Sequence, residues 1–597
     1  MARDQAEPLL RDSRPSSEQS SERHLEEEDA YISGKEAPPR KRGREAWREI
    51  GLFAWAVIAT ALVIILGVLY QHGQTTQPAP SDDGGKDSAK PKGKRNMIFM
   101  VSDGMGPTSL SMTRSFLQTS SDFPFDHELV LDSHLIGSSR TRSTDSLITD
   151  SAAGATAFSC GKKSYNSAIS VLPDHSACGT VLEAAKEAGY MTGLVVTTRI
   201  TDATPACFAA HVNRRESEDE IAEQEIGHSH PMGRVVDLIL GGGRCHFMSN
   251  STQDSCRQDN TDVIQIAKDS GWEYIFNRND FDNLDKGSAV KLPLLGLFAS
   301  TDIPYEIDRK LQTDKYPSLS EMASVALTAL SKATQNSDKG FFLMIEGSRI
   351  DHAGHANDPL AQVHEVLEYD KAFSTALDFL DKDATEGVIV STSDHETGGL
   401  AAARQLSEDK YPQYAWYPDM LVNGTHSASF LAHELKGHMG SPMGSSESAM
   451  KTFIRSQIVE AGLGVKDVTD GEIDEIWDSV HPDPKQQTGY LLADMISRRA
   501  QIGWSSHGHS AVDVNIYASS PDAAKPLIGN HENTEIGEFM ASYLDLDLGK
   551  ITEELQAKAP KEESWKGALV SDEDSNEGLD HYHGEFKKRR KRAIGKT

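Results

Sequence analysis

The sequence predicts an α/β fold with a mostly parallel central sheet flanked by helices on both faces. Three short apolar runs, at 97–101, 341–345 and 388–390, have the Val, Ile and Phe content of buried strands. Strand-like runs alternate with helical patterns from Asn96 to about residue 550, which is typical of repeated βαβ units. Each of the three runs also ends within a few residues on a carboxylate. Because ligands of open α/β sheets bind beyond the carboxyl ends of the strands, we expect these carboxylates to meet at one metal site.

The residues before this fold divide into three parts. Residues 1–49 are rich in Ser, Glu and Arg and lack apolar periodicity, so we expect a disordered tail. Residues 50–70 contain no charged side chain and are long enough to cross a hydrocarbon core, which predicts a transmembrane signal anchor. A cleaved signal peptide is the alternative, but a long polar tail precedes the run. Residues 71–95 have the composition of a flexible stalk.

Charges beside the anchor predict its orientation. Five basic residues lie between positions 40 and 48, and an uncharged polar stretch follows residue 70. The positive-inside rule therefore places the N-terminus in the cytoplasm and the rest of the chain in a lumen or outside, as in a single-pass type II membrane protein. Leu9 and Leu10 form a candidate dileucine signal for a sorting adaptor, although the spacing of the preceding Glu7 differs from the usual form.

The main domain is expected over residues 96–550. Apolar residues at helical spacing over 360–379 predict a helix that covers the sheet. Loop-rich sequence with irregular helices interrupts the βα rhythm near 403–500, so we interpret this stretch as an insertion. Residues 551–597 form a polar C-terminal tail that ends in a basic run, and it is either a solvated tail or a propeptide removed by proteases. Further strands are expected at 193–196 and 236–240.

Composition excludes some classes of protein. The 597 residues carry a formal net charge of −30 and form no basic stripe, so we expect no nucleic-acid partner. Five cysteines are too few for a disulfide-built scaffold. Cys245 and Cys256 are close enough in sequence for one local disulfide in an oxidising compartment. They flank a glycosylation sequon at Asn250, and Asn423 begins a second sequon.

Metal-ligand residues cluster after the second and third apolar runs. Asp351 and His355 are four residues apart, so one helical turn would place both beside a single zinc ion. Glu346 lies at the strand end and is better placed for a second ion. Asp394 and His395 are adjacent and can chelate one metal where the backbone bends. A histidine of the later segment Trp504–His509 could complete a zinc shell. A single histidine is more often a surface or capping residue, but their joint occurrence at strand ends favours ligands.

Two further segments suggest anion chemistry. Ser151 is followed by small residues that suit a tight turn into a helix, whose N-terminus attracts anions. An ordinary N-capped helix is the alternative for this segment alone. Asp202 and Thr204 offer oxygens to a hard cation such as magnesium. The neighbouring Arg214 and Arg215 are candidates for a bidentate phosphate clamp.

Six segments of this chain resemble those of alkaline phosphatases, in the same order. They are VSDGMG, TDSAAGAT, TDATPA, EGSRIDHAGH, TSDHETGG and SHGHSAVDV, and the resemblance covers about residues 95–550. With the single anchor and the extended tails, the chain is most similar to the vacuolar members of this family in fungi. The resemblance implies an alkaline-phosphatase-like fold, a homodimer, a place in the vacuolar membrane, with the cell surface as the alternative, and broad activity on small-molecule and peptide phosphate monoesters.

The resemblance also implies roles for individual residues. Ser151 matches a nucleophile that becomes phosphoserine, and Arg215, with Arg214 as the alternative, matches the phosphate clamp. The implied cofactors are two zinc ions and one magnesium ion per subunit. The implied ligands are Asp351, His355 and His509 for the first zinc, Asp103, Asp394, His395 and Ser151 for the second zinc, and Asp103, Thr204 and Glu346 for magnesium. His509 is preferred to His507 because Asp513 then falls at the family spacing.

One pair departs from the common patterns of the family. Bacterial relatives often place an aspartate and a lysine near the magnesium, and animal enzymes two histidines, whereas this chain has Asp202 and His352. The metal preference of the third site and the pH optimum therefore stay open. Sulfatases and nucleotide phosphodiesterases use other nucleophile motifs, and an inactive anchored protein would be expected to lack a ligand or the nucleophile, but all are present.

Overall fold

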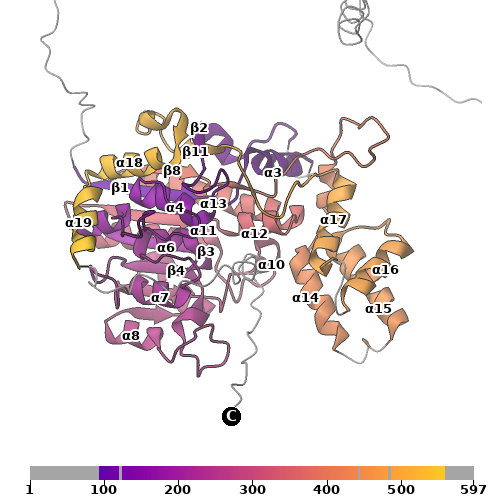
Figure 1. Ribbon diagram of the computed structural model, residues 1–597, viewed down its shortest axis with the longest axis horizontal. Coiled ribbons are helices and arrows are strands. Elements are labelled where there is room, and N and C mark those ends of the chain that lie inside the picture. The colour runs from indigo at the N-terminus through magenta and orange to yellow at the C-terminus, as the bar shows by residue number, and fades with distance from the viewer. Residues whose placement is uncertain (1–92, 120–123, 441–443, 445, 482–485, 559–597) are drawn as a thin grey trace, which may run out of the picture. The chain divides into compact units, whose positions relative to one another are not determined.

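A ten-stranded sheet forms the centre of the molecule in the computed structural model, which describes residues 93–558 except 120–123, 441–443, 445 and 482–485. The strand order is β12-β2-β11-β8-β1-β7-β3-β4-β6-β5 (Figure 1). Every pairing in it is parallel except those of β11 with β8 and β2. The predicted fold class is therefore confirmed. The strands are β1 Arg95–Val101, β2 Leu135–Arg140, β3 Met191–Arg199, β4 Leu238–Gly242, β5 Glu273–Ile275, β6 Leu294–Leu297, β7 Phe341–Glu346, β8 Glu386–Thr392, β11 Val514–Ala518 and β12 Gly529–Glu532.

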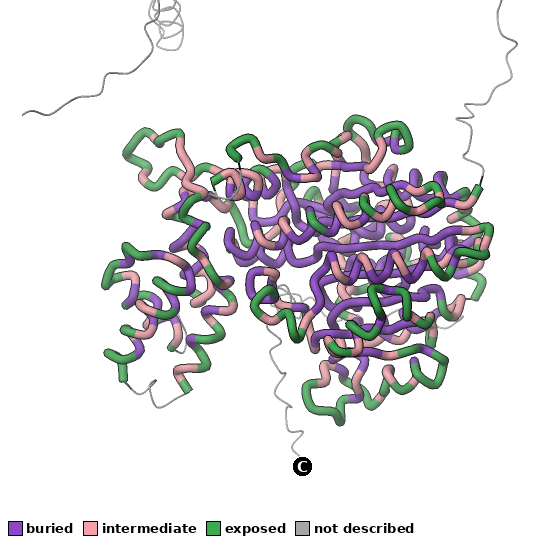
Figure 2. Tube along the Cα trace, turned by 180° about the vertical axis from the view of Figure 1, so that it is seen from behind, coloured by how far each residue is buried: buried purple, intermediate pink, exposed green. Residues whose placement is uncertain are grey.

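Helices cover both faces of the sheet, and alternate side chains of each central strand point to opposite cores. On one face Phe99 packs in a core with α4, α5, α6, α7, α8 and α18. On the other, Ile98 packs in a core with α3, α9, α11 and α13. Figure 2 shows the buried residues gathered in the interior of the domain and the exposed residues along its periphery. The bounds are α3 Pro107–Thr119, α4 Ser151–Cys160, α5 Val181–Glu187, α6 Ala203–Ala209, α7 Glu218–Glu225, α8 Val263–Asp269, α9 Arg278–Asp282, α10 Glu306–Arg309, α11 Leu319–Ala333, α12 Arg349–His355, α13 Pro359–Lys382, α18 Asn533–Leu544 and α19 Leu548–Lys558.

Local sequence fixes where these helices begin. Asp358 caps α13 by accepting from the backbone N–H groups of Leu360 and Ala361, and Pro359 occupies the first helical position, where its missing N–H costs nothing. Helices α5 and α11 each start with a reciprocal capping box of Thr or Ser and Glu. Helix α13 contains the whole stretch 360–379 for which a covering helix was predicted.

Two short strands, β9 (Glu396–Thr397) and β10 (His509–Ser510), form a separate antiparallel pair. The chain between them lies outside the main sheet. The stretch 403–500, which the sequence predicts to be an insertion, contains both regular and irregular helices with a core of their own, which includes Leu431, Leu435 and Leu492. They are drawn in orange in Figure 1. This core reaches α3 and α13 through Met112 and Leu360. The elements are η4 Pro418–Leu421, α14 Ala428–Met439, α15 Glu447–Phe453, the π-helix Ile454–Leu463, α16 Asp470–Ser479 and α17 Thr488–Ala500.

The ends of the described chain extend slightly beyond the boundaries drawn from sequence. Strand β1 begins at Arg95, and α19 continues to Lys558, past residue 551. Ile551 and Leu555 of α19 are buried against Ala184 of α5. The predicted tail 1–49, anchor 50–70, most of the stalk 71–95 and the rest of the C-terminal tail lie outside the described residues. Within the described part of the chain, no helix is both long enough and apolar enough to span a membrane.

Two disulfides lie in the described domain. Cys245 pairs with Cys256, the pair that the sequence suggested, and Cys160 pairs with Cys178, which it did not. The fifth cysteine, Cys207, is buried and unpaired by disulfide.

Candidate metal centre and nucleophile

The carboxyl ends of three neighbouring strands create the site. In the sheet register, Val101 of β1 lies opposite both Glu346 of β7 and Thr392 of β8, so these strands end at the same level. Glu346 is itself the last residue of β7, Asp103 and Asp394 lie two residues beyond the ends of β1 and β8, and all three are buried. The structure thus brings together the three carboxylates that the sequence placed at strand ends.

One group of donors comes from α12 and β10. The Asp351 Oδ2 atom lies 3.3 Å from His355 Nε2, and Asp351 Oδ1 lies 3.6 Å from His509 Nε2. The two Nε2 atoms of His355 and His509 face each other at 3.1 Å. His509 is brought here by the pairing of β10 with β9, in which it lies opposite Thr397. These three residues are the predicted ligands of the first zinc.

A second group of donors lies beside the first. Ligand atoms of Asp103, Asp394 and His395 all lie within 4.8 Å of one another. The same limit holds for Asp351, His395 and His509, so His395 adjoins both groups. Ser151 completes the second group, because its Oγ atom lies 3.1 Å from His395 Nε2. These four residues, Asp103, Asp394, His395 and Ser151, are the ones predicted for the second zinc.

The histidine side chains are oriented so that each presents Nε2 to the site. His355 Nδ1 contacts the His507 carbonyl oxygen, and His509 Nδ1 lies 2.8 Å from the Thr149 carbonyl oxygen. A carbonyl can only accept, so each Nδ1 carries the hydrogen and each Nε2 keeps its lone pair. The His507 Nδ1 also faces a carbonyl oxygen, that of His355 at 2.7 Å, but its ring stacks on Tyr490, and His507 belongs to none of the donor clusters among the described residues, whereas His509 does. The geometry therefore favours His509 over His507 as a ligand.

The third predicted set, Asp103, Thr204 and Glu346, offers only oxygens. Glu346 accepts a 2.6 Å hydrogen bond from Ser348 Oγ, and the Thr204 hydroxyl on α6 lies near enough to lower its pKa. Burial nevertheless raises the pKa of Glu346 to about 8. An all-oxygen set of this kind suits magnesium better than zinc.

The charges at this site require cations. Burial, followed by the repulsion of Asp394, Asp351 and Glu346, raises the pKa of Asp103 well above its usual value. Among the described residues, Asp103 Oδ1 and Asp394 Oδ2 are buried without a hydrogen-bond partner. Unpaired buried carboxylate oxygens are costly unless they are paired or bind a metal. Mixed imidazole and carboxylate donors beside an all-oxygen set fit zinc and magnesium.

Ser151 occupies the first residue of α4. Asp150 caps this helix by accepting from Ala153 N–H at 2.9 Å, and its other oxygen accepts from Ser167 N–H at 2.8 Å. The buried hydroxyl of Ser151 therefore lies at a helix N-terminus, where an anion is favoured.

Arg215 lies behind this turn. It contacts Asp150 at 3.4 Å and donates a 2.8 Å hydrogen bond to Asp202 Oδ1, which places its guanidinium near the serine. Arg214 is exposed. The geometry therefore favours Arg215 as the phosphate clamp.

Asp202 and His352 are both buried or nearly so, but they have different partners. Asp202 lies between Arg199 and Arg215, and these cations lower the pKa of its carboxyl below the usual value despite burial. His352 Nδ1 lies 3.6 Å from Asp302 Oδ2, and burial lowers the pKa of the imidazole. The mixed pair noted in the sequence thus sits in a network that also contains Arg199 and Asp302.

Sequence reasoning missed three polar residues around the site. Thr397 donates to Asp351 Oδ1 at 2.5 Å and contacts His395 Nδ1 at 3.2 Å. Arg199 and Asp302 pair with each other at 2.9 Å and bracket Asp202 and His352. Thr397 lies within the TSDHETGG segment and Arg199 ends a strand three residues before Asp202, so position in the chain was the available signal for both. Asp302 lies in a loop that carries no such signal.

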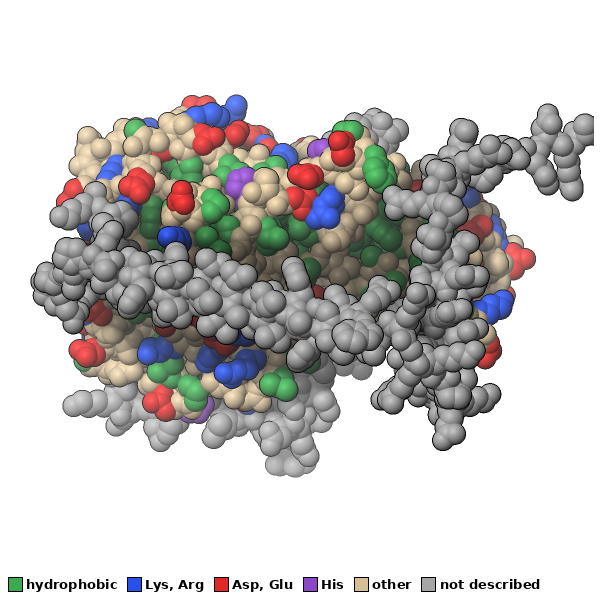
Figure 3. Space-filling model, turned by 90° about the horizontal axis from the view of Figure 1, so that it is seen from above, with side chains coloured by type: hydrophobic (Ala, Val, Ile, Leu, Met, Phe, Trp, Pro, Cys, Tyr) green, Lys and Arg blue, Asp and Glu red, His purple; other side chains and the backbone are tan. Residues whose placement is uncertain are grey.

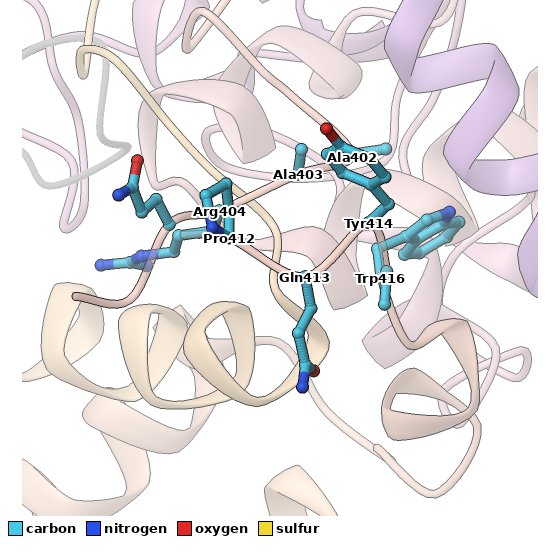
Figure 4. Close-up of a pocket in the computed structure, with 9 residues that line it drawn as sticks. Ala402, Ala403, Arg404, Pro412, Gln413, Tyr414 and Trp416 are labelled. Atoms are coloured by element: carbon cyan, nitrogen blue, oxygen red, sulfur yellow. The ribbon is translucent and has the colours of Figure 1, made fainter. Parts of the chain in front are cut away.

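A surface hollow elsewhere does not overlap with this site. It is lined by residues of the stretch 402–416, among them Arg404, Tyr414 and Trp416 (Figure 4). None of the residues that line it is a predicted ligand or the predicted nucleophile.

Known proteins resemble this chain in both sequence and structure. The alkaline phosphatase family model matches residues 94–546. The repressible alkaline phosphatase of Saccharomyces cerevisiae is 50% identical over 545 residues, which are 88% of this chain and 93% of that protein. A cold-active alkaline phosphatase from a Shewanella species has a TM-score of 0.62 and 30% identity, covering 75% of this chain and 99% of the other. A mutant alkaline phosphatase from the Antarctic bacterium TAB5, with Mg bound in its M3 site, has a TM-score of 0.52 and 26% identity, covering 76% and 99%.

The fold, the strand-end carboxylates and these similarities define the class: the chain belongs to the alkaline phosphatase family. Members of this family are metal-dependent hydrolases. The chain itself is an alkaline phosphatase that hydrolyses phosphate monoesters.

Proposed function

We propose that this alkaline phosphatase acts on a broad range of small-molecule and peptide phosphate monoesters through a phosphoserine intermediate on Ser151, with two zinc ions and one magnesium ion. The observation that carries the proposal is the position of the Ser151 hydroxyl. It lies 3.1 Å from His395 Nε2, at the N-terminus of α4 and beside two groups of metal donors. The donor sets are those named above for each ion. When bound, zinc lowers the pKa of a coordinated hydroxyl and offsets charge on the transferring phosphoryl group.

The proposed reaction consists of two displacements at phosphorus. The Ser151 oxygen forms a bond to phosphorus as the bond to the alcohol oxygen breaks, and the alcohol leaves with a proton. A water oxygen then displaces the serine oxygen from phosphorus, which releases inorganic phosphate and returns the hydroxyl. Arg215 donates hydrogen bonds to the phosphoryl oxygens in both steps, and the N-terminus of α4 favours their charge. Few side chains are left to contact the alcohol, which supports broad specificity.

Substitution of Ser151 tests this assignment. We expect full-length S151A to lose more than 99% of p-nitrophenyl phosphate hydrolysis, roughly the 10² to 10⁴-fold range of a lost catalytic group. Acid quenching of the wild type with radiolabelled phosphate should trap label on the Ser151 peptide and none in S151A. S111A is the matched control, because Ser111 is exposed on α3. Label on another residue, or activity that survives a chelator, would reject the mechanism.

The placement in the cell is part of the same proposal. The anchor at 50–70 would hold the chain in the vacuolar membrane with a cytoplasmic N-terminus, and the two disulfides support an oxidising lumen for the domain. Asn250 and Asn423 are both exposed, as glycosylation requires. A homodimer and an adaptor that reads Leu9 and Leu10 complete the proposal.

Protease treatment of intact vesicles tests the orientation. We expect the domain to be protected, and we expect its gel mobility to shift after glycosidase treatment. Digestion of the domain without detergent would contradict the orientation.

A further inference from the structure

Arg199 is a buried arginine at the end of β3 that contacts three carboxylates in three directions. Its Nη2 atom donates to Asp202 Oδ2 at 2.9 Å, its Nε atom to Glu218 Oε2 at 2.8 Å, and its Nη1 atom to Asp302 Oδ1 at 2.9 Å. Only 6% of its side chain is exposed. The fork of the guanidinium makes this possible, because an ammonium group cannot bond along three fixed directions in one plane.

Asp202 connects Arg199 to Arg215. One carboxylate oxygen, Oδ2, accepts from Arg199, and the other, Oδ1, accepts from Arg215 at 2.8 Å. The carboxylate is therefore shared between two arginines and cannot rotate without losing one of them. It also begins α6, whose second residue is the candidate ligand Thr204. The side chain that holds Asp202 in place thus affects both the clamp and the oxygen donor set.

Hydrogen bonds to both its backbone and its side chain hold Arg199 in place. The Arg199 N–H donates to Asp302 Oδ1 at 3.0 Å, so Asp302 holds both the main chain and the side chain of the same residue. Glu218 Oε2 also accepts from Thr201 Oγ1 at 2.6 Å, which fixes the second anchor. Arg199 is thus held by Asp302 and Glu218, and its third partner, Asp202, is the one that links it to Arg215.

We propose that Arg199 is a positioning residue for phosphate binding, which acts by holding the Asp202 carboxylate and, through it, the guanidinium of Arg215. This inference rests on the proposed role of Arg215 as the phosphate clamp. Arg199 also offsets part of the Asp202 charge. Without it, Asp202 pairs more strongly with Arg215, and less of the Arg215 charge is available to a phosphoryl group.

Kinetics of single variants test the inference. R199K keeps a positive charge among the three carboxylates, so it is the variant expected to fold, whereas R199M removes the charge as well. We expect R199K to raise the KM for p-nitrophenyl phosphate and the Ki for inorganic phosphate together by about tenfold, with a smaller change in kcat. R199M should raise both further. R309K is the matched control, because Arg309 is a buried arginine paired with Glu306 and makes no contact with Asp202 in the described structure.

The double variant separates positioning from a general structural effect. If Arg199 acts through Arg215, R199K added to R215A leaves the Ki for phosphate at the R215A value, since residues in one network do not contribute additively. Additive effects, or an R199K enzyme with unchanged Ki beside an R215A enzyme with a raised one, would overturn the positioning role and leave the clamp intact. If R215A itself binds phosphate as the wild type does, the proposed clamp fails first.

Discussion

At the scale of single residues, the histidine tautomers determine what the site can bind. His355 and His509 donate through Nδ1 to main-chain carbonyl oxygens, and His395 Nδ1 faces the Thr397 hydroxyl. Because that hydroxyl gives its own hydrogen to Asp351, it accepts from His395. All three rings therefore keep the Nε2 lone pair for a metal ion.

Thr397 is expected to affect metal binding without touching the metal. Replacing it with valine removes the acceptor of His395 Nδ1 and the donor to Asp351, so T397V should bind zinc 10 to 100-fold more weakly, roughly the cost of losing such an outer contact. Competition with a zinc-binding dye measures this. T375V provides the control, because among the described residues the Thr375 hydroxyl bonds only the carbonyl oxygen of Lys371, one turn earlier in α13. Equal zinc affinity in T397V and the wild type would show that the orientation comes from elsewhere.

Some site residues could be predicted from sequence, and others could not, for a physical reason. Asp103, Glu346 and Asp394 lie at or just beyond the ends of apolar strands, and parallel strands end at one edge, so local sequence specifies their place. Arg199 and Asp302 are a hundred residues apart and meet only because β3 ends beside the loop after β6. The partner of Cys160 was equally hidden, since many pairings of five cysteines are compatible with the spacing.

At the scale of elements, α13 carries a buried glutamate whose charge depends on pH. Glu365 accepts from the Glu306 N–H at 2.6 Å, and burial raises its pKa to about 8. The folded state keeps this proton between about pH 4.5 and 8, whereas the unfolded chain has lost it. Unfolding then releases a proton, so this group lowers the free energy of unfolding as pH rises through that window, by roughly 5 kcal/mol in all.

E365Q should remove this dependence. Glutamine resembles the neutral acid and cannot ionise, so its urea midpoint should fall less than that of the wild type between pH 5 and pH 9. E386Q is the control, since Glu386 is exposed at the start of β8. Parallel curves for E365Q and the wild type would mean that Glu365 is ionised throughout.

The turn after β1 brings that strand close to α12. Gly104 has φ +75°, and a Cβ atom there would lie 2.5 Å from Asp351 Cα. G104A should therefore displace the helix that carries Asp351 and lower kcat/KM roughly 100-fold, the usual cost of a misplacement near 1 Å. Phosphatase assays and zinc content measure the loss. G437A is the control, because Gly437 on α14 has open space around it; equal losses in both variants would contradict the steric explanation.

Elements differed in how well sequence defined them. The apolar periodicity over 360–379 identifies the interior of α13, whereas its ends are marked only by the Asp358 cap and by a single lysine in the last turn, Lys382. The expectation of irregular helices over 403–500 holds in part: the π-helix Ile454–Leu463 and the 3-10 helix Pro418–Leu421 are irregular, whereas α14, α16 and α17 are regular. The apolar residues of α14, α16 and α17 pack in a core of their own rather than on the sheet. Their spacing therefore does not follow the alternation of strand and covering helix that marks the rest of the domain.

At the scale of the whole molecule, metal ions should be a main source of stability. Without them the buried Asp103, Glu346 and Asp394 repel one another, and binding only to the folded state stabilises it by mass action. Prolonged chelation should lower the unfolding free energy by about 4 kcal/mol relative to protein in excess zinc and magnesium. Calorimetry measures the shift, and S151A should show nearly the same one, because it keeps the carboxylates. An unchanged melting temperature after verified metal loss would contradict this.

The surface matches the composition. Figure 3 shows acidic and basic side chains interspersed over one face of the domain. On this face neither sign of charge gathers into one field, so the face provides no specific long-range steering of an anionic substrate. Attraction of phosphate must come from the local cations at the site.

The short antiparallel pair of β9 and β10 holds together the two ends of the helical insertion. The segment between β9 and β10, about a hundred residues long, therefore starts and ends at neighbouring points, because Thr397 of β9 lies opposite His509 of β10. Lineages can therefore lengthen, shorten or exchange the intervening helices while the coordination geometry below is inherited unchanged. New recognition of bulky substrates can arise there without the chemistry having to evolve again.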